Sequence, residues 1–259
     1  MDPFDFLQRY YELQRGIMFD EIYDLGFATI TYCSGDTTGF WNQALVEGSL
    51  TGDEIEKIER KMQSLRRVPT MYFVHNTGNE ELVKHLKELG YKESFEDSWM
   101  FHSGKGINKT RFSQVTKVET ADDLELFSEV FDECYQPDDP QNAYGELGDY
   151  LNVAERVWKE FGSRDKVQYF LAFDGDRPVA VATLTSLQGI GYISNVGFLS
   201  DVRGRGYGKL ATMYCVNLSV EAGNKEHCLA TEEGTYANEF YKRIGFETKF
   251  SAVAFSKGT

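Results

Sequence analysis

The segment whose residues most clearly suit a binding or catalytic role is a glycine-rich turn at residues 203–209, between a predicted strand and a predicted amphipathic helix. Glycines at such a junction let consecutive backbone N–H groups converge at a helix N-terminus, where the helix dipole favours an anion. The turn also carries Arg203, Arg205 and Lys209, although the protein as a whole is acidic. This combination predicts a phosphate-binding cradle.

The spacing of the glycines narrows the type of phosphate site. The pattern G-x-G-x-G differs from the dinucleotide fingerprint G-x-G-x-x-G, which belongs to the first strand–helix turn of a parallel sheet. A P-loop needs Gly-Lys followed by Ser or Thr, whereas Gly208 and Lys209 are followed by Leu210. Neither a dinucleotide site nor a nucleotide-hydrolysing loop is predicted. The simpler alternative is that the glycines only cap a helix and the arginines are solvated.

A second motif, YANEFYKRIGF at residues 236–246, predicts a helix that ends at Gly245 before a new strand. The order of strand, R-G-x-G-x-G turn, long helix, strand, and helix with a tyrosine four residues before Gly-Phe resembles the GNAT superfamily of acetyl-CoA-dependent N-acetyltransferases. The resemblance extends over residues 112–259. It implies an α/β (α+β) fold, with a mixed, largely antiparallel central sheet flanked by helices.

The resemblance also implies a binding site for acetyl-CoA as co-substrate, without a metal. The end of the strand before the turn would pair its backbone with the pantetheine arm, and one N–H there would face the thioester oxygen. Family members often have proline at the position of Ser200. The implied pantetheine-binding residues are Phe198, Leu199 and Ser200, and the turn that would wrap the pyrophosphate comprises Arg203, Gly204, Arg205, Gly206, Tyr207, Gly208 and Lys209.

In the family, the tyrosine that matches Tyr241 often acts as general acid toward the leaving thiolate. A phenol with a pKa of about 10 is suited to this task; the alternative is a core aromatic. The family's cofactor-touching asparagine falls on Gly234 here, so Asn238 is a candidate replacement. We expect direct attack of the amine on the thioester, with the oxyanion stabilised by strand N–H groups and no acetylated enzyme.

The amine must lose a proton, because alkylamines are almost wholly protonated at neutral pH. The candidate bases are Glu232 and Glu233 at the end of a predicted strand, or a water held by Asn195. An acidic loop at residues 132–149, which includes Tyr135 and Tyr144 and has no Lys or Arg, is a candidate lining for a cationic acceptor.

Composition excludes several other functions. The protein has 27 Lys and Arg against 41 Asp and Glu, a net charge of −14, which disfavours nucleic acid and favours a cationic partner. No apolar run approaches 18 residues and the N-terminus lacks a signal-peptide pattern, so no membrane association and a cytoplasmic location are expected. The four cysteines and four histidines lack metal-ligand spacing.

The chain is expected to contain two domains, because residues 103–111 have linker composition. An offset of 155 residues relates Gly90 to Gly245 and predicts that residues 1–105 are a degenerate GNAT-like copy of the catalytic domain at 111–259. The copy has Leu86 at the position of Tyr241 and no R-G-x-G turn, so we expect no cofactor site in it.

The sequence therefore predicts an N-acetyltransferase that moves acetyl from acetyl-CoA to a primary amine of a small molecule or peptide. The alternative is a catalytically silent acetyl-CoA-binding sensor or scaffold, and a longer acyl group is a variant of the first hypothesis. The acceptor and the oligomeric state are left open, with a homodimer compatible with the sequence.

Overall fold

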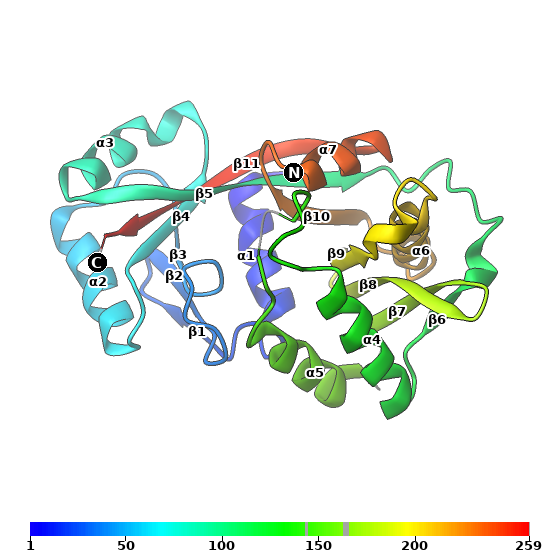
Figure 1. The fold of residues 1–259 in the computed structure, drawn as a ribbon. Coiled ribbons are helices and arrows are strands. Elements are labelled where there is room, and N and C mark those ends of the chain that lie inside the picture. Colours follow the sequence, from blue (N-terminus) through cyan, green and yellow to red (C-terminus); the bar gives the residue numbers. More distant parts are fainter. Residues whose placement is uncertain (143–144, 163–165, 259) are drawn as a thin grey trace. The chain divides into compact units, whose positions relative to one another are not determined.

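The computed structural model describes residues 1–142, 145–162 and 166–258. The chain divides into two compact units (Figure 1). Unit 1 comprises Met1–Trp99 and Thr248–Thr259, and unit 2 comprises Met100–Glu247. Two strands, β5 (Tyr91–His102) and β11 (Phe246–Lys257), run across the division in sequence.

Unit 1 is built on strands in the order β1-β2-β3-β4-β11-β5. Strands β3 and β4 are parallel, whereas β11 is antiparallel to β4. The core lies between this sheet and two amphipathic helices, which bury Ile55, Ile58 and Leu82. The remaining bounds are α1 (Pro3–Gln14), β1 (Glu21–Asp24), β2 (Ala28–Tyr32), β3 (Ala44–Val46), α2 (Gly52–Ser64), β4 (Thr70–Val74) and α3 (Glu80–Glu88).

Unit 2 has the strand order β10-β9-β8-β7-β6, antiparallel except for the pair β9–β10. The turn between β7 and β8 contains Gly175 in the left-handed region, as a tight β-hairpin turn requires. The bounds are β6 (Val115–Lys117), α4 (Ala121–Glu133), α5 (Tyr150–Phe161), β7 (Val167–Asp174), β8 (Arg177–Leu187), β9 (Ile190–Phe198), α6 (Tyr207–Glu221), β10 (Glu226–Glu232) and α7 (Tyr236–Arg243).

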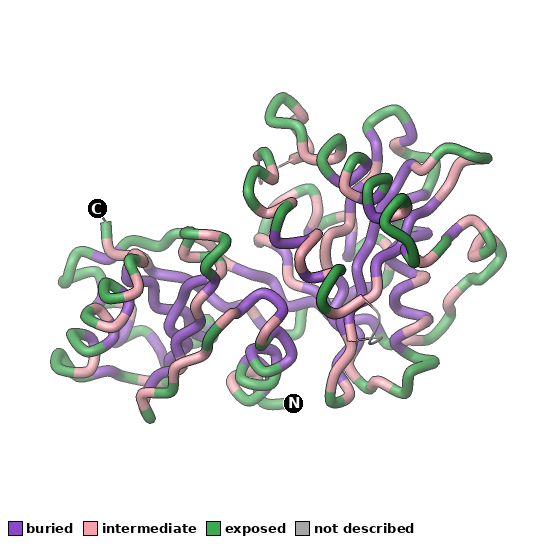
Figure 2. The backbone as a smooth tube through the Cα atoms, turned by 90° about the horizontal axis from the view of Figure 1, so that it is seen from below, coloured by how far each residue is buried: buried purple, intermediate pink, exposed green. Residues whose placement is uncertain are grey.

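The structure confirms the predicted fold class, a mixed and largely antiparallel sheet flanked by helices. Figure 2 shows buried backbone running through the interior of each unit, with exposed residues on the outside. Strand β4 is buried along its whole length. Strand β6 begins only at Val115, because Phe112–Gln114 form a 3-10 turn. None of the helices in the described residues is both long enough and apolar enough to cross a membrane.

The 155-residue offset relates secondary-structure elements as well as single residues. Strands β5 and β11 match it at both ends, and α2 and α6 begin at equivalent positions, Gly52 and Tyr207. Gly90 and Gly245 both follow a helix with positive φ, +86° and +104°. Both halves of the sequence therefore contain the series strand, helix, parallel strand, helix, strand.

The structure divides the chain differently from the sequence at two segments. Residues 100–105, assigned by sequence to the first domain, lie in unit 2. Residues 248–259, assigned by sequence to the second domain, lie in unit 1. The reason is backbone pairing, since Ala252–Ser256 of β11 pair with Thr70–Val74 of β4.

Candidate functional site

The glycine-rich turn forms an open helix N-terminus, as a phosphate cradle requires. Gly206 is the N-cap of α6, with φ of +84°, and Gly204 also has a positive φ of +76°. Within the described chain no side chain caps this end, and the first turn of α6 has no acidic residue. The leading N–H groups of a helix lack intrahelical partners, so those of Tyr207, Gly208 and Lys209 are available to an anion.

The equivalent helix of unit 1 is closed by its own side chains. Thr51, which the 155-residue offset pairs with Gly206, caps α2 and accepts a hydrogen bond from the Glu54 amide. The Glu54 carboxylate accepts in return from the Thr51 amide, at 2.8 Å. Asp53 adds a second acidic side chain to this turn. Two carboxylates thus place negative charge at this helix end, which disfavours an anion there and gives a physical reason to expect no cofactor in unit 1.

The basic residues of the turn point in different directions. Arg205 pairs with Asp174 at 2.7 Å, and the Tyr207 hydroxyl donates to the same carboxylate at 2.7 Å. The Tyr207 hydroxyl and, after it, Arg205 lower the pKa of Asp174. Lys209 is exposed. Arg203 instead pairs with Asp139, from the loop that follows α4.

Sequence reasoning missed Arg111, which also belongs to this turn. Its guanidinium stacks on the Tyr207 ring at 4.5 Å and donates to the Arg205 carbonyl at 3.1 Å. The only signal was the basic composition of residues 103–111, which we interpreted as a linker. Arg111 places another positive charge beside the open helix end.

Strand β9 carries a bulge just before the predicted pantetheine-binding residues. The pairing with β8 shifts between Val181 and Thr183, so that two residues of β9 oppose one of β8. One of the two is Asn195, which has a left-handed φ of +51°. Its side chain accepts from the Tyr150 hydroxyl at 2.8 Å and donates to the Thr183 hydroxyl at 3.2 Å. Asn195 is thus held as part of the bulge.

The backbone of Phe198 is directed away from β8. The Leu199 amide donates to the Val179 carbonyl at 2.9 Å. Because hydrogen-bonded and non-hydrogen-bonded pairs alternate along an antiparallel ladder, the N–H and C=O of Phe198 point to the other side. On that side the parallel pairing with β10 covers Ile190–Tyr192 among the described residues, so Phe198 lies beyond it.

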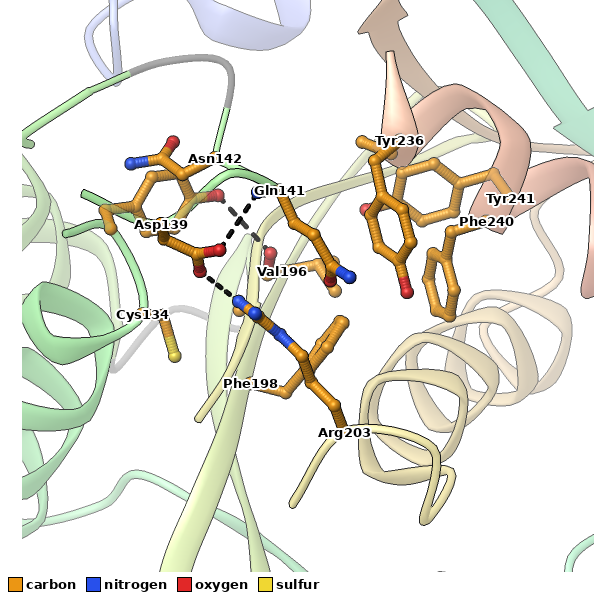
Figure 3. A pocket seen from close by; sticks show the side chains of 13 residues that line it. Cys134, Asp139, Gln141, Asn142, Val196, Phe198, Arg203, Tyr236, Phe240 and Tyr241 are labelled. Carbon is orange, nitrogen blue, oxygen red and sulfur yellow. Dashed lines mark hydrogen bonds and ion pairs between the residues drawn. The ribbon is translucent and has the colours of Figure 1, made fainter. Parts of the chain in front are cut away.

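A pocket with an empty volume of about 530 Å³ lies at this end of β9, entirely within unit 2 (Figure 3). Three segments surround it: the loop after α4, the end of β9 with Arg203, and one face of α7. The lining residues are Cys134, Tyr135, Asp139, Gln141, Asn142, Val196, Gly197, Phe198, Arg203, Tyr236, Ala237, Phe240 and Tyr241.

The pocket brings together some of the predicted site residues and leaves others out. Tyr241 lines it, is 9% exposed and packs edge-to-face on Phe240 and Phe246. Asn238 is fully buried with its amide near the Met100 sulfur, and it does not line the pocket.

The two candidate bases also lie outside the lining. Glu232, at the end of β10, is half-buried, and Glu233 is exposed and 3.6 Å from Lys242. Leu199 has its amide bonded to Val179 and its carbonyl accepting from Val202, and the Ser200 carbonyl accepts from Arg203. Of the three predicted pantetheine-binding residues, Phe198 therefore has the backbone best placed for a ligand.

The acidic loop contributes a cluster of polar and aromatic side chains to the pocket. Burial acts to raise the pKa of Asp139, but hydrogen bonds from Arg203 and the Gln141 amide, with the charge of Arg203, outweigh it and lower the pKa. Burial raises the pKa of the Cys134 thiol. Tyr135 donates to the Val196 carbonyl at 3.3 Å. Tyr144, also named from sequence, lies outside the described residues.

No group of three or more potential metal ligands occurs among the described His, Cys, Asp and Glu residues. The four cysteines are free thiols.

Comparisons with known proteins agree with this geometry. The model of the acetyltransferase (GNAT) family matches residues 124–246, whereas no curated protein matches the chain. A GCN5-related N-acetyltransferase from Kribbella flavida has a similar structure, with 20% identity, a TM-score of 0.68, and coverage of 97% of this chain and 95% of that one.

Two further structures cover both units. A conserved protein of unknown function from Staphylococcus epidermidis has 16% identity and a TM-score of 0.67, covering 93% of this chain and 94% of that one. A tandem GNAT protein from the clavulanic acid biosynthesis pathway has 10% identity and a TM-score of 0.56, covering 90% and 79%. At such identities the likeness shows a shared fold.

Proposed function

We propose that this protein transfers the acetyl group of acetyl-CoA to a primary amine of a small molecule or peptide, because residues 124–246 match the model of the GNAT acetyltransferase family. One observation carries the proposal. A single pocket contains Tyr241 and the end of β9 at Phe198, and Gly208 at the open end of α6 lies against the Phe198 ring.

The residues present fit coenzyme A. The N–H groups at the start of α6, with Arg111 and Lys209 beside them, would hold the pyrophosphate. The backbone of Phe198 would pair with the pantetheine arm, and its N–H would donate to the thioester oxygen as negative charge develops there. When bound, acetyl-CoA supplies the thioester carbon that the amine attacks.

For the deprotonated amine, the transfer balances with one proton donor and one proton acceptor; the ammonium form first releases a proton to water, and Tyr241 regains its proton from water afterwards. The amine nitrogen forms a bond to the acyl carbon, the carbon–sulfur bond breaks, and the Tyr241 hydroxyl donates its proton to the departing sulfur. The amine gives up a proton. Glu232 and Glu233 do not line the pocket, so either would have to receive this proton through a water molecule. We assign the proton to Glu232, because Glu233 is exposed and paired with Lys242.

The test is CoA release from acetyl-CoA, followed with a thiol reagent, across polyamines, aminoglycosides, amino acids, arylalkylamines and short peptides. Tyr241→Phe should lower kcat by about 10²–10⁴-fold, the usual contribution of general acid catalysis. It should also remove the fall in rate at alkaline pH that a general acid produces.

The matched control is Tyr236→Phe, which alters a pocket-lining tyrosine of the same helix that is 40% exposed. We expect this variant to stay within a few-fold of the parent. Full activity of Tyr241→Phe would disprove the assigned role, and acetyl-CoA binding without turnover on any amine would favour the cofactor-sensing alternative.

A further inference from the structure

The ion pair between Arg203 and Asp139 crosses the pocket (Figure 3). Arg203 comes from the turn before α6 and Asp139 from the loop after α4, and both line the pocket. Their side chains are 26% and 12% exposed, so the pair is largely shielded from water. Among the described lining residues these two are the charged ones, and each neutralises the other.

Two polar atoms at this ion pair lack a hydrogen-bond partner in the described structure. They are the Arg203 Nε atom and the Gln141 Oε1 atom, which are both buried. Such atoms cost free energy unless a ligand or a water pairs with them. One is a donor and the other an acceptor, and both belong to residues that line the same pocket.

Asp139 is anchored independently of Arg203. The Gln141 amide donates to its carboxylate at 2.9 Å, and the amide of Asp139 donates to the Gln136 carbonyl at 3.2 Å. The carboxylate would therefore remain at the pocket if Arg203 moved. Arg203, in contrast, begins at the turn whose amides are proposed to hold the pyrophosphate, so a phosphate there would compete with Asp139 for the guanidinium.

We propose that Asp139 binds the ammonium group of the acceptor, and that Arg203 covers it until the pyrophosphate of CoA draws the guanidinium away; this rests on the function proposed above. Once Arg203 has moved, Asp139 is a half-buried carboxylate without a counter-charge in the pocket lining, which favours a cation. CoA and amine should therefore strengthen each other's binding.

The other residues that line the pocket indicate which chemical group is attached to the ammonium of the acceptor. Five aromatic rings, those of Tyr135, Phe198, Tyr236, Phe240 and Tyr241, line the pocket and suit an apolar or aromatic group. A carboxylate beside the ammonium would be repelled by Asp139. The acceptor class is therefore an arylalkylamine-like primary amine rather than a free amino acid.

The first test is calorimetric titration of the full chain with CoA. Asp139→Asn removes the competitor for Arg203 and should tighten CoA binding about 5–10-fold, while Arg203→Gln should weaken it by a similar factor. Asp138→Asn, an exposed neighbour, controls for the general loss of a negative charge and should change the affinity less than 2-fold.

The second test titrates 2-phenylethylamine into the parent protein with and without saturating CoA. Binding should be at least 10-fold tighter with CoA, should be lost in Asp139→Asn, and should be absent for the uncharged twin 2-phenylethanol. Phenylalanine, the carboxylated twin, should bind at least 10-fold more weakly.

The outcomes separate the two proposals. If CoA does not bind the parent protein, the proposed function fails. If CoA binds, but Asp139→Asn binds it no more tightly while melting at the parent's temperature, only the role of Asp139 is overturned. If the parent–CoA complex does not bind 2-phenylethylamine, the acceptor class is wrong.

Discussion

A single methyl group added at Gly208 tests whether α6 is held at its close distance from β9. A Cβ at this position would lie 2.4 Å from Cδ1 and 2.7 Å from Cε1 of the Phe198 ring, well inside van der Waals contact. Phe198 lines the pocket, so Gly208→Ala must push either the ring or the start of the helix away from the site.

The expected loss follows from two opposing effects. Overpacking of this kind costs about 1–3 kcal/mol, and alanine in place of glycine in a helix returns up to about 1 kcal/mol. We expect a net loss of about 1–2 kcal/mol in the free energy of unfolding. At roughly 2–4 °C per kcal/mol, the melting temperature should fall by about 2–8 °C.

The matched control is Gly52→Ala at the start of α2, where an added Cβ would meet nothing within 4 Å. This variant should be as stable as the parent or gain up to about 1 kcal/mol. Thermal melts followed by circular dichroism, together with the KM for acetyl-CoA, would decide. If Gly208→Ala matches Gly52→Ala in stability and keeps the parental KM, the packing argument is refuted.

Two further predictions concern the half-buried Asn195 and the buried pair His102 and His227. Asn195→Ala removes the hydrogen bonds with Tyr150 and Thr183 and should cost about 1–3 kcal/mol, with a parallel loss of kcat/KM; an unchanged melting temperature would contradict this. Burial lowers the pKa of His102 and, with the charge of His102, that of His227. As the pH falls, these histidines are therefore protonated at a higher pH in the unfolded chain than in the folded chain. The free energy of unfolding should be constant above about pH 6.5 and should decrease below it. Melts from pH 7.5 to 5.5 should show a smaller decline for His227→Gln, and an equal decline would refute the assignment.

Local patterns were sufficient to predict much of the fold. Glycine at Gly206 and Gly245 and the periodicity of the helices define the elements around the site, because these signals act over a few residues. The placement of Tyr241 at the pocket also followed from its spacing before Gly245, through the family resemblance. The 155-residue offset also holds for whole helices and strands, because these elements are defined by the same local signals.

Long-range pairing could not be predicted in the same way. Asp139 and Arg203 are 64 residues apart, and no periodicity connects them. Arg111 appeared to be a linker residue because its partner, Tyr207, is brought to it only by the folded chain. Leu199 was expected to bind the pantetheine arm, yet its amide donates to the Val179 carbonyl. This bond depends on the register between two strands, which the sequence of one strand does not reveal.

The position of β11 has a consequence for how the protein is made. Val74 of β4 pairs with Ala252, so a ribosome must synthesise the whole of unit 2 before unit 1 can receive this strand. The unit that begins first along the chain is completed last, through contacts of very long sequence separation, which are slow to form. Proteolytic removal of residues 248–259 would accordingly damage the N-terminal half of the sequence, and a fragment cut at residue 105 would leave β4 with an unpaired edge open to aggregation.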